Sequence, residues 1–319
     1  MSVTQHEIPV VTPYRLDLTV SALRRLSMNV VDVLTPDGEY VRALGGAHGA
    51  VIARVRQARP GTLSVTIEGD ADDHAPSLAL VRRTLGVDRD LTDFDRAAAS
   101  IPWLAPLVER MCGVKPPRYP VLWEACASAI VFQQVSLRAA SAIMHRLILA
   151  VGRSVEADGV PVPLYLFPDA ERVRDAPDDV LRLIGLSANK GATLRRVAEA
   201  LAFGTLDAMT LEGCTSPDAA AMLRRIKGIG PWTAAVILLR GLGRLDVFPA
   251  SDTSVASNMA LVAGVASIDA PRVLDVLGSQ RGMLYFYLLL ARLEARGESG
   301  RPSFERPRSV VHHAGDSNR

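Results

Sequence analysis

The amino-acid sequence predicts an α+β protein in which a small N-terminal α+β domain precedes an all-α domain. Segments between residues 13 and 90 alternate apolar and polar side chains, as half-buried strands do. Over residues 91–297 this alternation gives way to successive helix-length segments with the apolar period of an α-helix. Residues 298–319 are polar and unpatterned, which predicts a disordered tail. The expected domains are therefore 1–90 and 91–297, followed by the tail.

The N-terminal domain contains three predicted strands and one helix. The strands are YRLDLTV (14–20), GAVIARVRQAR (49–59) and GTLSVTIEG (61–69). Gly-Gly, Pro-Gly and Gly-Asp steps between and after them supply turns. SLALVRRTLG (77–86) has the period of an amphipathic helix, which we expect to pack on one face of the sheet.

The composition excludes several classes of protein. Hydrophobic residues make up 49% of the 319-residue chain, but no apolar run reaches the roughly 20 residues that span a bilayer. The first residues, MSVTQHEIPVVTPYR, lack the basic start and apolar core of a signal peptide. Three widely spaced cysteines, Cys112, Cys126 and Cys214, predict neither a disulfide framework nor a zinc site. A net charge of +2 does not by itself indicate polyanion binding. From the lengths of the apolar runs and the N-terminal sequence, we expect a cytoplasmic protein without a membrane partner.

A helix–hairpin–helix is predicted over residues 216–242. Ser216 can cap the first helix, and the proline and aspartate after it suit a first turn. Gly228 can adopt the left-handed conformation that ends a helix, and Pro231 begins the second helix. With Gly230, the corner is mostly backbone, so its N–H groups can approach a phosphate closely. An ordinary αα-turn, whose glycines only make the corner, is the alternative.

Asp252 follows the second hairpin helix after a short return, RLDVFPAS, and precedes the helical stretch TSVASNMALVAG. Aspartate is a preferred helix cap, which is the structural interpretation of this residue. The return also brings the next helix start back beside the hairpin, where a carboxylate would stand near a bound DNA strand. A negative charge there suits a reaction with developing positive charge, such as hydrolysis of a sugar C1′–N bond.

Together these features resemble the helix–hairpin–helix (HhH-GPD) DNA glycosylase superfamily, in particular the branch of bacterial 3-methyladenine DNA glycosylase II, the AlkA type. KGIGPWTAA, LRG and DVFPASD follow the order and spacing of that family. LWEACASAIVFQQVSLRAASAIMHRL (122–147) is similar to its helix pair, which breaks at a Gln-Gln-x-Ser junction. FPDAERVRDAPDDVLRLIGLSANKGATLRRVAEAL (167–201) is similar to the segment before the hairpin. The resemblance implies a TBP-like N-terminal domain and an all-α domain whose two lobes flank a DNA-binding cleft.

The resemblance also implies the roles of particular residues. Asp252 takes the catalytic position. Trp232, Tyr285 and Tyr287 would form the base pocket, although the position one turn after the tryptophan, aromatic in some relatives, is Val236 here. Trp103 and Trp123 are assigned to core packing. The DNA contacts would come from the hairpin and from the loop between the broken helices, namely Gln133, Gln134, Lys227, Gly228, Gly230 and Thr233.

The resemblance also implies a wedge residue and a cation site. Gln134 stands where the family places the wedge that fills the gap left by a flipped nucleotide, and capping of the helix break is its alternative role. The backbone carbonyls of Arg224, Ile226 and Ile229 match those that hold a monovalent cation, Na⁺ or K⁺, in the family. Because the ligands are backbone oxygens, the side chains neither support nor oppose such a site.

The lysines and cysteines bear on the type of reaction. The chain has three lysines, Lys115, Lys190 and Lys227. Lyase-competent relatives use a lysine nucleophile at the position of Trp232, and the hairpin lysine is expected to neutralise a phosphate. The resemblance therefore implies a monofunctional enzyme without AP lyase activity. No cysteine follows Cys214, so the four cysteines of iron–sulfur relatives are absent and we expect no required cofactor.

We interpret the sequence as that of a monomeric, nucleoid-associated DNA glycosylase. It would hydrolyse the N-glycosidic bond of damaged bases in double-stranded DNA during base excision repair, with a preference for alkylated purines. A glycosylase for oxidised or deaminated bases is one alternative. A non-catalytic helix–hairpin–helix DNA-binding protein is another, against which the carboxylate at position 252 argues.

Overall fold

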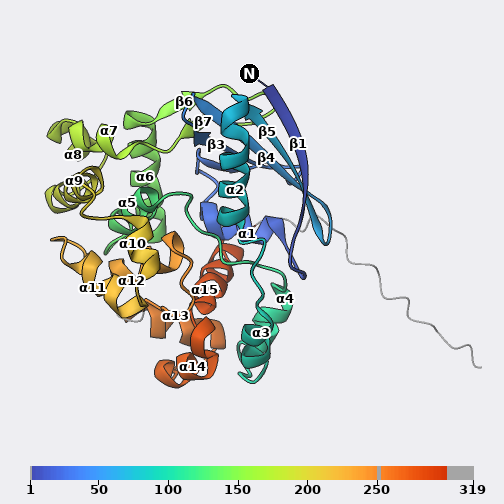
Figure 1. The fold of residues 1–319 in the computed structure, drawn as a ribbon. Coiled ribbons are helices and arrows are strands. Elements are labelled where there is room, and N and C mark those ends of the chain that lie inside the picture. The colour runs from blue at the N-terminus through green and yellow to red at the C-terminus, as the bar shows by residue number, and fades with distance from the viewer. Residues whose placement is uncertain (1, 250–252, 300–319) are drawn as a thin grey trace, which may run out of the picture.

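The computed structural model describes residues 2–249 and 253–299, and the side chains of residues 253–257 lie outside this description (Figure 1). The predicted mixed class is confirmed, since a five-stranded antiparallel sheet near the N-terminus is followed mainly by helices. No helix among the described residues is both long and apolar enough to cross a membrane. The TBP-like character of the N-terminal domain and the domain boundaries remain predictions.

The sheet has the strand order β1-β5-β4-β3-β2. Its strands are β1 (Ser2–Pro9), β2 (Asp32–Leu34), β3 (Tyr40–Gly45), β4 (Ala50–Arg59) and β5 (Thr62–Gly69). Successive side chains of β4 point to opposite faces, so Val51 and Val55 lie on the face covered by helix α2 (His74–Leu85). Ile52 lies on the other face, under the hairpin of β6 (Arg153–Val155) and β7 (Leu164–Leu166). Both faces of the sheet are therefore covered.

Two expectations about secondary structure were wrong. Residues 14–20 are not a strand, because helix α1 spans Leu16–Arg24. Every residue from Leu16 to Leu23 is buried, so polar and apolar side chains alike face protein and their alternation does not mark an exposed face. The sheet instead contains three strands that were not predicted, β1, β2 and β3, and β1 and β2 form its two edges. The hairpin of β6 and β7 interrupts the region expected to be all-α, and its three-residue strands are too short to show an alternation in the sequence.

The helices form two lobes with separate cores (Figure 1). The helices of the first lobe are α5 (Leu122–Val131), α6 (Leu137–Val151), α7 (Ala170–Asp175), α8 (Asp178–Leu183), α9 (Ala188–Ala202), α10 (Ala208–Gly213), α11 (Ser216–Arg224) and α12 (Pro231–Gly241). The helices of the second lobe are α3 (Thr92–Ala99), α4 (Ala105–Arg110), α13 (Thr253–Ala263), α14 (Ala270–Leu277) and α15 (Met283–Glu294). Two short 3-10 turns, η1 (Ala71–Asp73) and η2 (Gly278–Gln280), complete the described elements.

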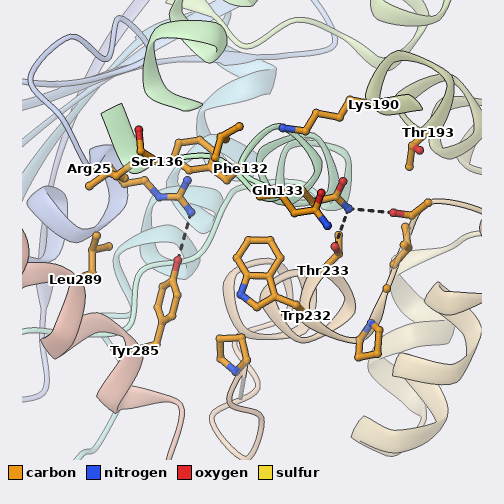
Figure 2. A pocket seen from close by; sticks show the side chains of 18 of the residues that line it. Arg25, Phe132, Gln133, Ser136, Lys190, Thr193, Trp232, Thr233, Tyr285 and Leu289 are labelled. Atoms are coloured by element: carbon orange, nitrogen blue, oxygen red, sulfur yellow. Dashed lines mark hydrogen bonds between the residues drawn. The ribbon is translucent and has the colours of Figure 1, made fainter. Parts of the chain in front are cut away.

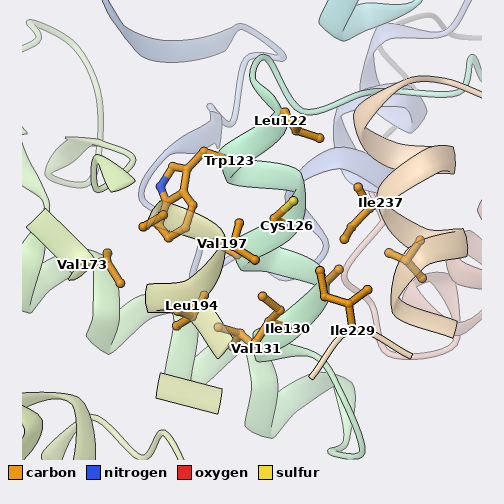
Figure 3. Packing of buried hydrophobic residues seen from close by; sticks show 14 of the residues in the cluster. Leu122, Trp123, Cys126, Ile130, Val131, Val173, Leu194, Val197, Ile229 and Ile237 are labelled. Carbon is orange, nitrogen blue, oxygen red and sulfur yellow. The ribbon is translucent and has the colours of Figure 1, made fainter. Parts of the chain in front are cut away.

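Helix α5 is the centre of the first lobe (Figure 3). Its ten residues are all buried, and Ile130 packs in the same cluster as Val197 of α9 and Ile237 of α12. Trp123 is buried there and donates a 2.7 Å hydrogen bond to the carbonyl of Pro168, which confirms its expected packing role. Trp103 packs against the core of the second lobe. Because α5 is fixed on all sides, the loop that follows it starts from a rigid base.

The C-terminal segment begins with contacts to the fold. The N–H of Ser27 donates a 2.9 Å hydrogen bond to the carboxylate of Glu298. This bond places the start of the predicted tail against the loop after α1. Residues 300–319, the rest of that tail, lie outside the described residues.

Candidate active site

A cleft of about 1240 Å³ is lined by both lobes and by the end of helix α1 (Figure 2). The first lobe supplies the loop between α5 and α6, the hairpin turn and the start of α9, and α15 supplies the facing wall. Most of the predicted site residues that the structure describes line this cleft: Gln133, Gln134, Gly228, Ile229, Gly230, Trp232, Thr233 and Tyr285. Residues distant in the sequence are thus brought together around one cavity.

The hairpin has the predicted form, with a different cap. Thr215, rather than Ser216, is the N-cap of α11, and its hydroxyl accepts a hydrogen bond from the N–H of Asp218. Ser216 is already the first helical residue, because a threonine one position earlier has the extended backbone that a cap requires. After α11 a turn leads to Gly230, the N-cap of α12, and Pro231 begins that helix. Both predicted hairpin helices are confirmed.

The two hairpin glycines have different structural reasons. Gly228 has a φ of +105°, and a Cβ built there would lie 2.0 Å from Oγ1 of Thr193 on α9. Glycine is therefore required at this position by the fold itself. Gly230 has a φ of −90°, which any residue adopts, and no described atom beyond its two chain neighbours lies within 4 Å of a built Cβ. The open space at Gly230 is available to a group from outside the chain.

The first backbone N–H groups of α12 are free to bind a ligand. Within the described part of the chain, the N–H groups of Gly230, Trp232 and Thr233 donate no hydrogen bond. Unpaired N–H groups and the positive end of the helix dipole meet at this point, beside the open space at Gly230. The arrangement can bind an anion such as a phosphate.

The loop between α5 and α6 is tied to the hairpin by one side chain. The amide Nε2 of Gln133 donates to the carbonyl of Gly228 at 2.9 Å and to Oγ1 of Thr233 at 2.7 Å (Figure 2). Both amide hydrogens are thereby engaged within the protein. Gln134 is exposed at the tip of the loop with a left-handed φ of 52°, so its side chain is the one available for contacts outside the chain. Ser136, rather than Gln134, is the N-cap of α6.

The predicted aromatic residues divide into two groups. Trp232 and Tyr285 are partly exposed and line the cleft from opposite lobes. Tyr287 does not line it: this side chain is 1% exposed and its ring stacks on Phe94 at 5.3 Å between centroids. Burial raises the pKa of the Tyr287 hydroxyl above its ordinary value. A helix turns by about 100° per residue, so two residues further along α15 the side chain faces the core of the second lobe.

Several cleft residues escaped the sequence analysis, among them Arg25, Phe132 and Lys190. Arg25 follows α1, a segment interpreted as a strand, and no signal in the sequence placed it in a site. Phe132 directly precedes the Gln-Gln pair, and this adjacency was a signal that could have found it. Lys190 lies in the first turn of α9, and its amine donates a 2.9 Å hydrogen bond to the carbonyl of Val131, the last residue of α5.

The described lining of the cleft is basic. Arg25, Lys190 and Arg292 are the charged residues among the described lining residues, and no acidic side chain stands among them. Partial burial lowers the pKa of the Lys190 amine. Desolvation alone would raise the pKa of Tyr285, but the guanidinium groups of Arg25 and Arg240 lower it overall. Lys227 is exposed on the hairpin and does not line the cleft, while its carbonyl accepts from Arg196 at 3.2 Å.

Asp252 lies outside the described residues, as do Ala250 and Ser251. The chain on either side of this gap borders the cleft, since Pro249 and Asn258 both line it. Helix α13 begins at Thr253, where the sequence predicts a helix start. The assignment of the catalytic role to Asp252 therefore stays a prediction.

The three carbonyls expected to hold a monovalent cation belong to the hairpin turn. Among described residues, the carbonyls of Arg224 and Ile229 accept no hydrogen bond, and that of Ile226 accepts one from the N–H of Ile229 at 3.0 Å. Each oxygen therefore retains at least one free lone pair. Oxygen donors of this kind fit a hard cation such as Na⁺ or K⁺.

Comparison with known proteins agrees with this geometry. Residues 127–275 match the family described as "HhH-GPD superfamily base excision DNA repair protein". Over 216 residues the chain is 33% identical to a Mycobacterium tuberculosis protein named "Probable bifunctional transcriptional activator/DNA repair enzyme AlkA", which covers 68% of this chain and 42% of that protein. It is 29% identical to the Bacillus subtilis "DNA-3-methyladenine glycosylase", over 55% of this chain and 57% of that one. The chain thus spans about half the length of these relatives.

The fold is also found in a solved structure. The structure of "3-methyladenine dna-glycosylase from Archaeoglobus fulgidus" superposes with a TM-score of 0.75 over 89% of this chain and 97% of that chain, at 23% sequence identity. This likeness includes the N-terminal sheet, because it extends well beyond the matched family segment. Residues 127–275, which contain the hairpin and most of the broken helix pair, therefore belong to the HhH-GPD superfamily of base excision DNA repair proteins.

Proposed function

We propose that the chain is a DNA glycosylase that hydrolyses the C1′–N bond of alkylated purines in double-stranded DNA. One observation carries this proposal: a single cleft contains the N-terminus of α12, the exposed tip of the loop after α5, and the aromatic side chains of Trp232 and Tyr285. Those are the parts needed to bind a strand, fill the gap left by a flipped nucleotide and stack on its base. The name of the Bacillus relative, a DNA-3-methyladenine glycosylase, supports this activity, and the name of the Mycobacterium relative supports a role in DNA repair.

The hairpin and its surroundings would hold the DNA backbone. A phosphate would occupy the open space beside Gly230 and accept hydrogen bonds from the free N–H groups at the start of α12. Lys227, exposed on the turn, would add positive charge next to it. Gln134 would enter the duplex as the wedge, and Gln133 would fix the position of that wedge relative to the bound phosphate.

Asp252 would act on the sugar. As the C1′–N bond breaks, its electron pair leaves with the base and positive charge develops on C1′ and the ring oxygen. A carboxylate close to C1′ stabilises this charge and accepts a proton from the attacking water. Its neighbours in the sequence border the cleft on both sides of the gap, at Pro249 and Asn258. Trp232 and Tyr285 would stack on the departing base.

We further propose that the enzyme is monofunctional and releases the base without cutting the strand. The position of the lyase nucleophile in relatives holds Trp232. Lys190 is the lysine that lines the cleft, and its amine is directed to the carbonyl of Val131 at the end of α5. This contact supports a role in fixing the end of α5 and the following loop. An imine would require this amine to leave its carbonyl partner.

No cofactor is proposed for the chemistry. The carbonyls of Arg224, Ile226 and Ile229 would hold a Na⁺ or K⁺ ion, which would stabilise the hairpin turn and add positive charge behind the phosphate site. A monomer in the cytoplasm, associated with the nucleoid, is the proposed state of the protein.

Base release from duplexes that each carry one lesion tests the function directly. The panel contains alkylated purines, an oxidised purine and deaminated bases in the same sequence context. We expect release of the alkylated purines. Preferential release of oxidised or deaminated bases would support the other glycosylase function. Binding of every duplex without release of any base would identify a non-catalytic DNA-binding protein.

A further inference from the structure

Arg25 is a buried cation in the wall of the cleft. The side chain follows helix α1, is 4% exposed and lines the cleft beside Phe132 and Tyr285 (Figure 2). Its backbone has a left-handed φ of 64°, which a residue other than glycine rarely adopts. The surrounding structure therefore holds this residue in an uncommon conformation that directs a permanent charge into a desolvated place.

The guanidinium of Arg25 has few partners for a buried charge. Nη2 donates a long hydrogen bond of 3.4 Å to the hydroxyl of Tyr285. Nε and Nη1 are buried and, among the described residues, have no hydrogen-bond partner. Buried N–H donors without partners are uncommon in folded proteins, and those of Arg25 belong to a side chain that lines the cleft, where a bound ligand can supply an acceptor.

The same guanidinium covers an aromatic face of the cleft. Its central carbon lies 3.7 Å from the centroid of the Phe132 ring. The face of an aromatic ring is negative and attracts a cation, and here that attraction is already used by Arg25. A cationic base in the cleft would meet a positive charge where an aromatic pocket would otherwise offer a negative face.

We propose that Arg25 is a specificity-determining residue that favours uncharged alkylated purines over N-alkylated purines that carry a positive charge. This inference rests on the proposed glycosylase function and refines its substrate class. When an uncharged base leaves, the electron pair of the C1′–N bond makes it an anion, which the nearby guanidinium stabilises. When a cationic base leaves, the same electron pair neutralises it, so the guanidinium gives no such stabilisation. Before that step, the positive charge of Arg25 opposes binding of the cationic base.

A role of Arg25 as an ordinary phosphate ligand is less consistent with its surroundings. Phosphate ligands at a DNA surface are exposed, as Lys227 is, whereas Arg25 is enclosed by Phe132 and Tyr285. A purely structural role predicts that its replacement slows release of all bases equally. Selectivity between two lesions, measured on one preparation, separates these roles because losses of folding or of active enzyme cancel in the ratio.

The test compares single-turnover release of 1,N6-ethenoadenine, an uncharged adduct, with that of 7-methylguanine, a cationic one, in the same duplex at subsaturating enzyme. For Arg25→Gln we expect the rate on the cationic lesion, relative to the uncharged one, to rise at least about tenfold, equivalent to about 1.4 kcal/mol. Arg25→Lys, which keeps the charge, should stay within about threefold of the wild-type ratio. Tyr285→Phe removes the hydrogen-bond partner and keeps the cation, so it too should retain selectivity.

Two results would overturn the inference. If wild-type protein releases both lesions and Arg25→Gln leaves their ratio unchanged, Arg25 does not select by charge, while the proposed function stands. If the wild type releases neither lesion, the proposed function fails, and the inference fails with it. Arg25→Met keeps an unbranched apolar stem and provides a second uncharged variant should Arg25→Gln not fold.

Discussion

The hairpin glycines allow the fold and the DNA contact to be separated by two alanine substitutions. Gly228→Ala places a methyl group 2.0 Å from Thr193 Oγ1 at a φ of +105°. Backbone strain of this kind costs about 1–3 kcal/mol, and the clash adds to it. Large domains lose about 2–4 °C of Tm per kcal/mol, so a clear fall in Tm is expected. Gly230→Ala meets open space at a φ of −90°, so its Tm should stay within about 1 °C of wild type, since such surface changes are worth ~0.5 kcal/mol or less.

Gly230→Ala, which is expected to keep the wild-type Tm, should nevertheless bind DNA more weakly than the wild type. A methyl group at position 230 would displace a phosphate from the N–H groups at the start of α12, and a hydrogen bond to a charged group contributes about 1.5–3 kcal/mol. Gly230→Ala should therefore weaken binding at least about tenfold. Gly230→Asp adds a negative charge and should weaken binding further. Fluorescence anisotropy with undamaged and lesion-containing duplexes, at two salt concentrations, measures these affinities, and thermal unfolding measures Tm.

The results also show which interpretation of the hairpin is wrong. Wild-type DNA affinity in Gly230→Ala and Gly230→Asp, with unchanged Tm, would refute the phosphate site and leave an ordinary αα-turn. A loss of affinity confined to lesion-containing duplexes would place the hairpin in the base pocket instead. An unchanged Tm for Gly228→Ala would show that the approach of the turn to Thr193 is looser than the structure indicates.

Three further predictions concern the chemistry and the loop. Asp252→Asn should reduce the rate of base release by at least about two orders of magnitude and leave the DNA affinity similar or higher, because the lost charge acts mainly on the transition state. A rate of base release near that of the wild type would leave Asp252 only its capping role. After base release the abasic strand should stay intact until alkali is added, and borohydride should trap no covalent adduct, since trapping requires an imine. An adduct that disappears in Lys190→Gln or in Lys227→Ala would identify that amine as a nucleophile. Gln133→Leu should lower the free energy of unfolding by about 1–2 kcal/mol, because it removes two hydrogen bonds. A double-mutant cycle with Thr233→Val, measured by urea unfolding, should show a coupling energy of about 0.5–1.5 kcal/mol. A coupling energy of zero would mean that the loop and the hairpin are not linked in solution.

Local sequence signals were sufficient for the elements that the site uses. Glycines, prolines and capping residues, whose backbone preferences act over a few positions, predict the hairpin helices and the helix start at Thr253. The identity of the cap is a finer matter, and Thr215 took the place expected for Ser216 because either hydroxyl can satisfy the same N–H groups. The family resemblance, not spacing along the chain, placed Trp232 and the Gln-Gln loop in one site, and in the structure both line one cleft.

Other features were decided only when distant segments packed together. Helix α1 is buried on every side, so an alternation of polar and apolar residues resembled a strand although no face is exposed. Whether Tyr285 or Tyr287 faces the cleft depends on how α15 is rotated when it packs against Phe94. The sequence of α15 alone does not determine this rotation. Arg25 is remote from the family segment and enters the cleft only because its helix packs against α15. The sequence by itself thus determined the hairpin and the helix that starts at Thr253, since these depend on local backbone preferences. The tertiary structure decided which charges and rings face the base, because burial depends on contacts between segments far apart in the chain.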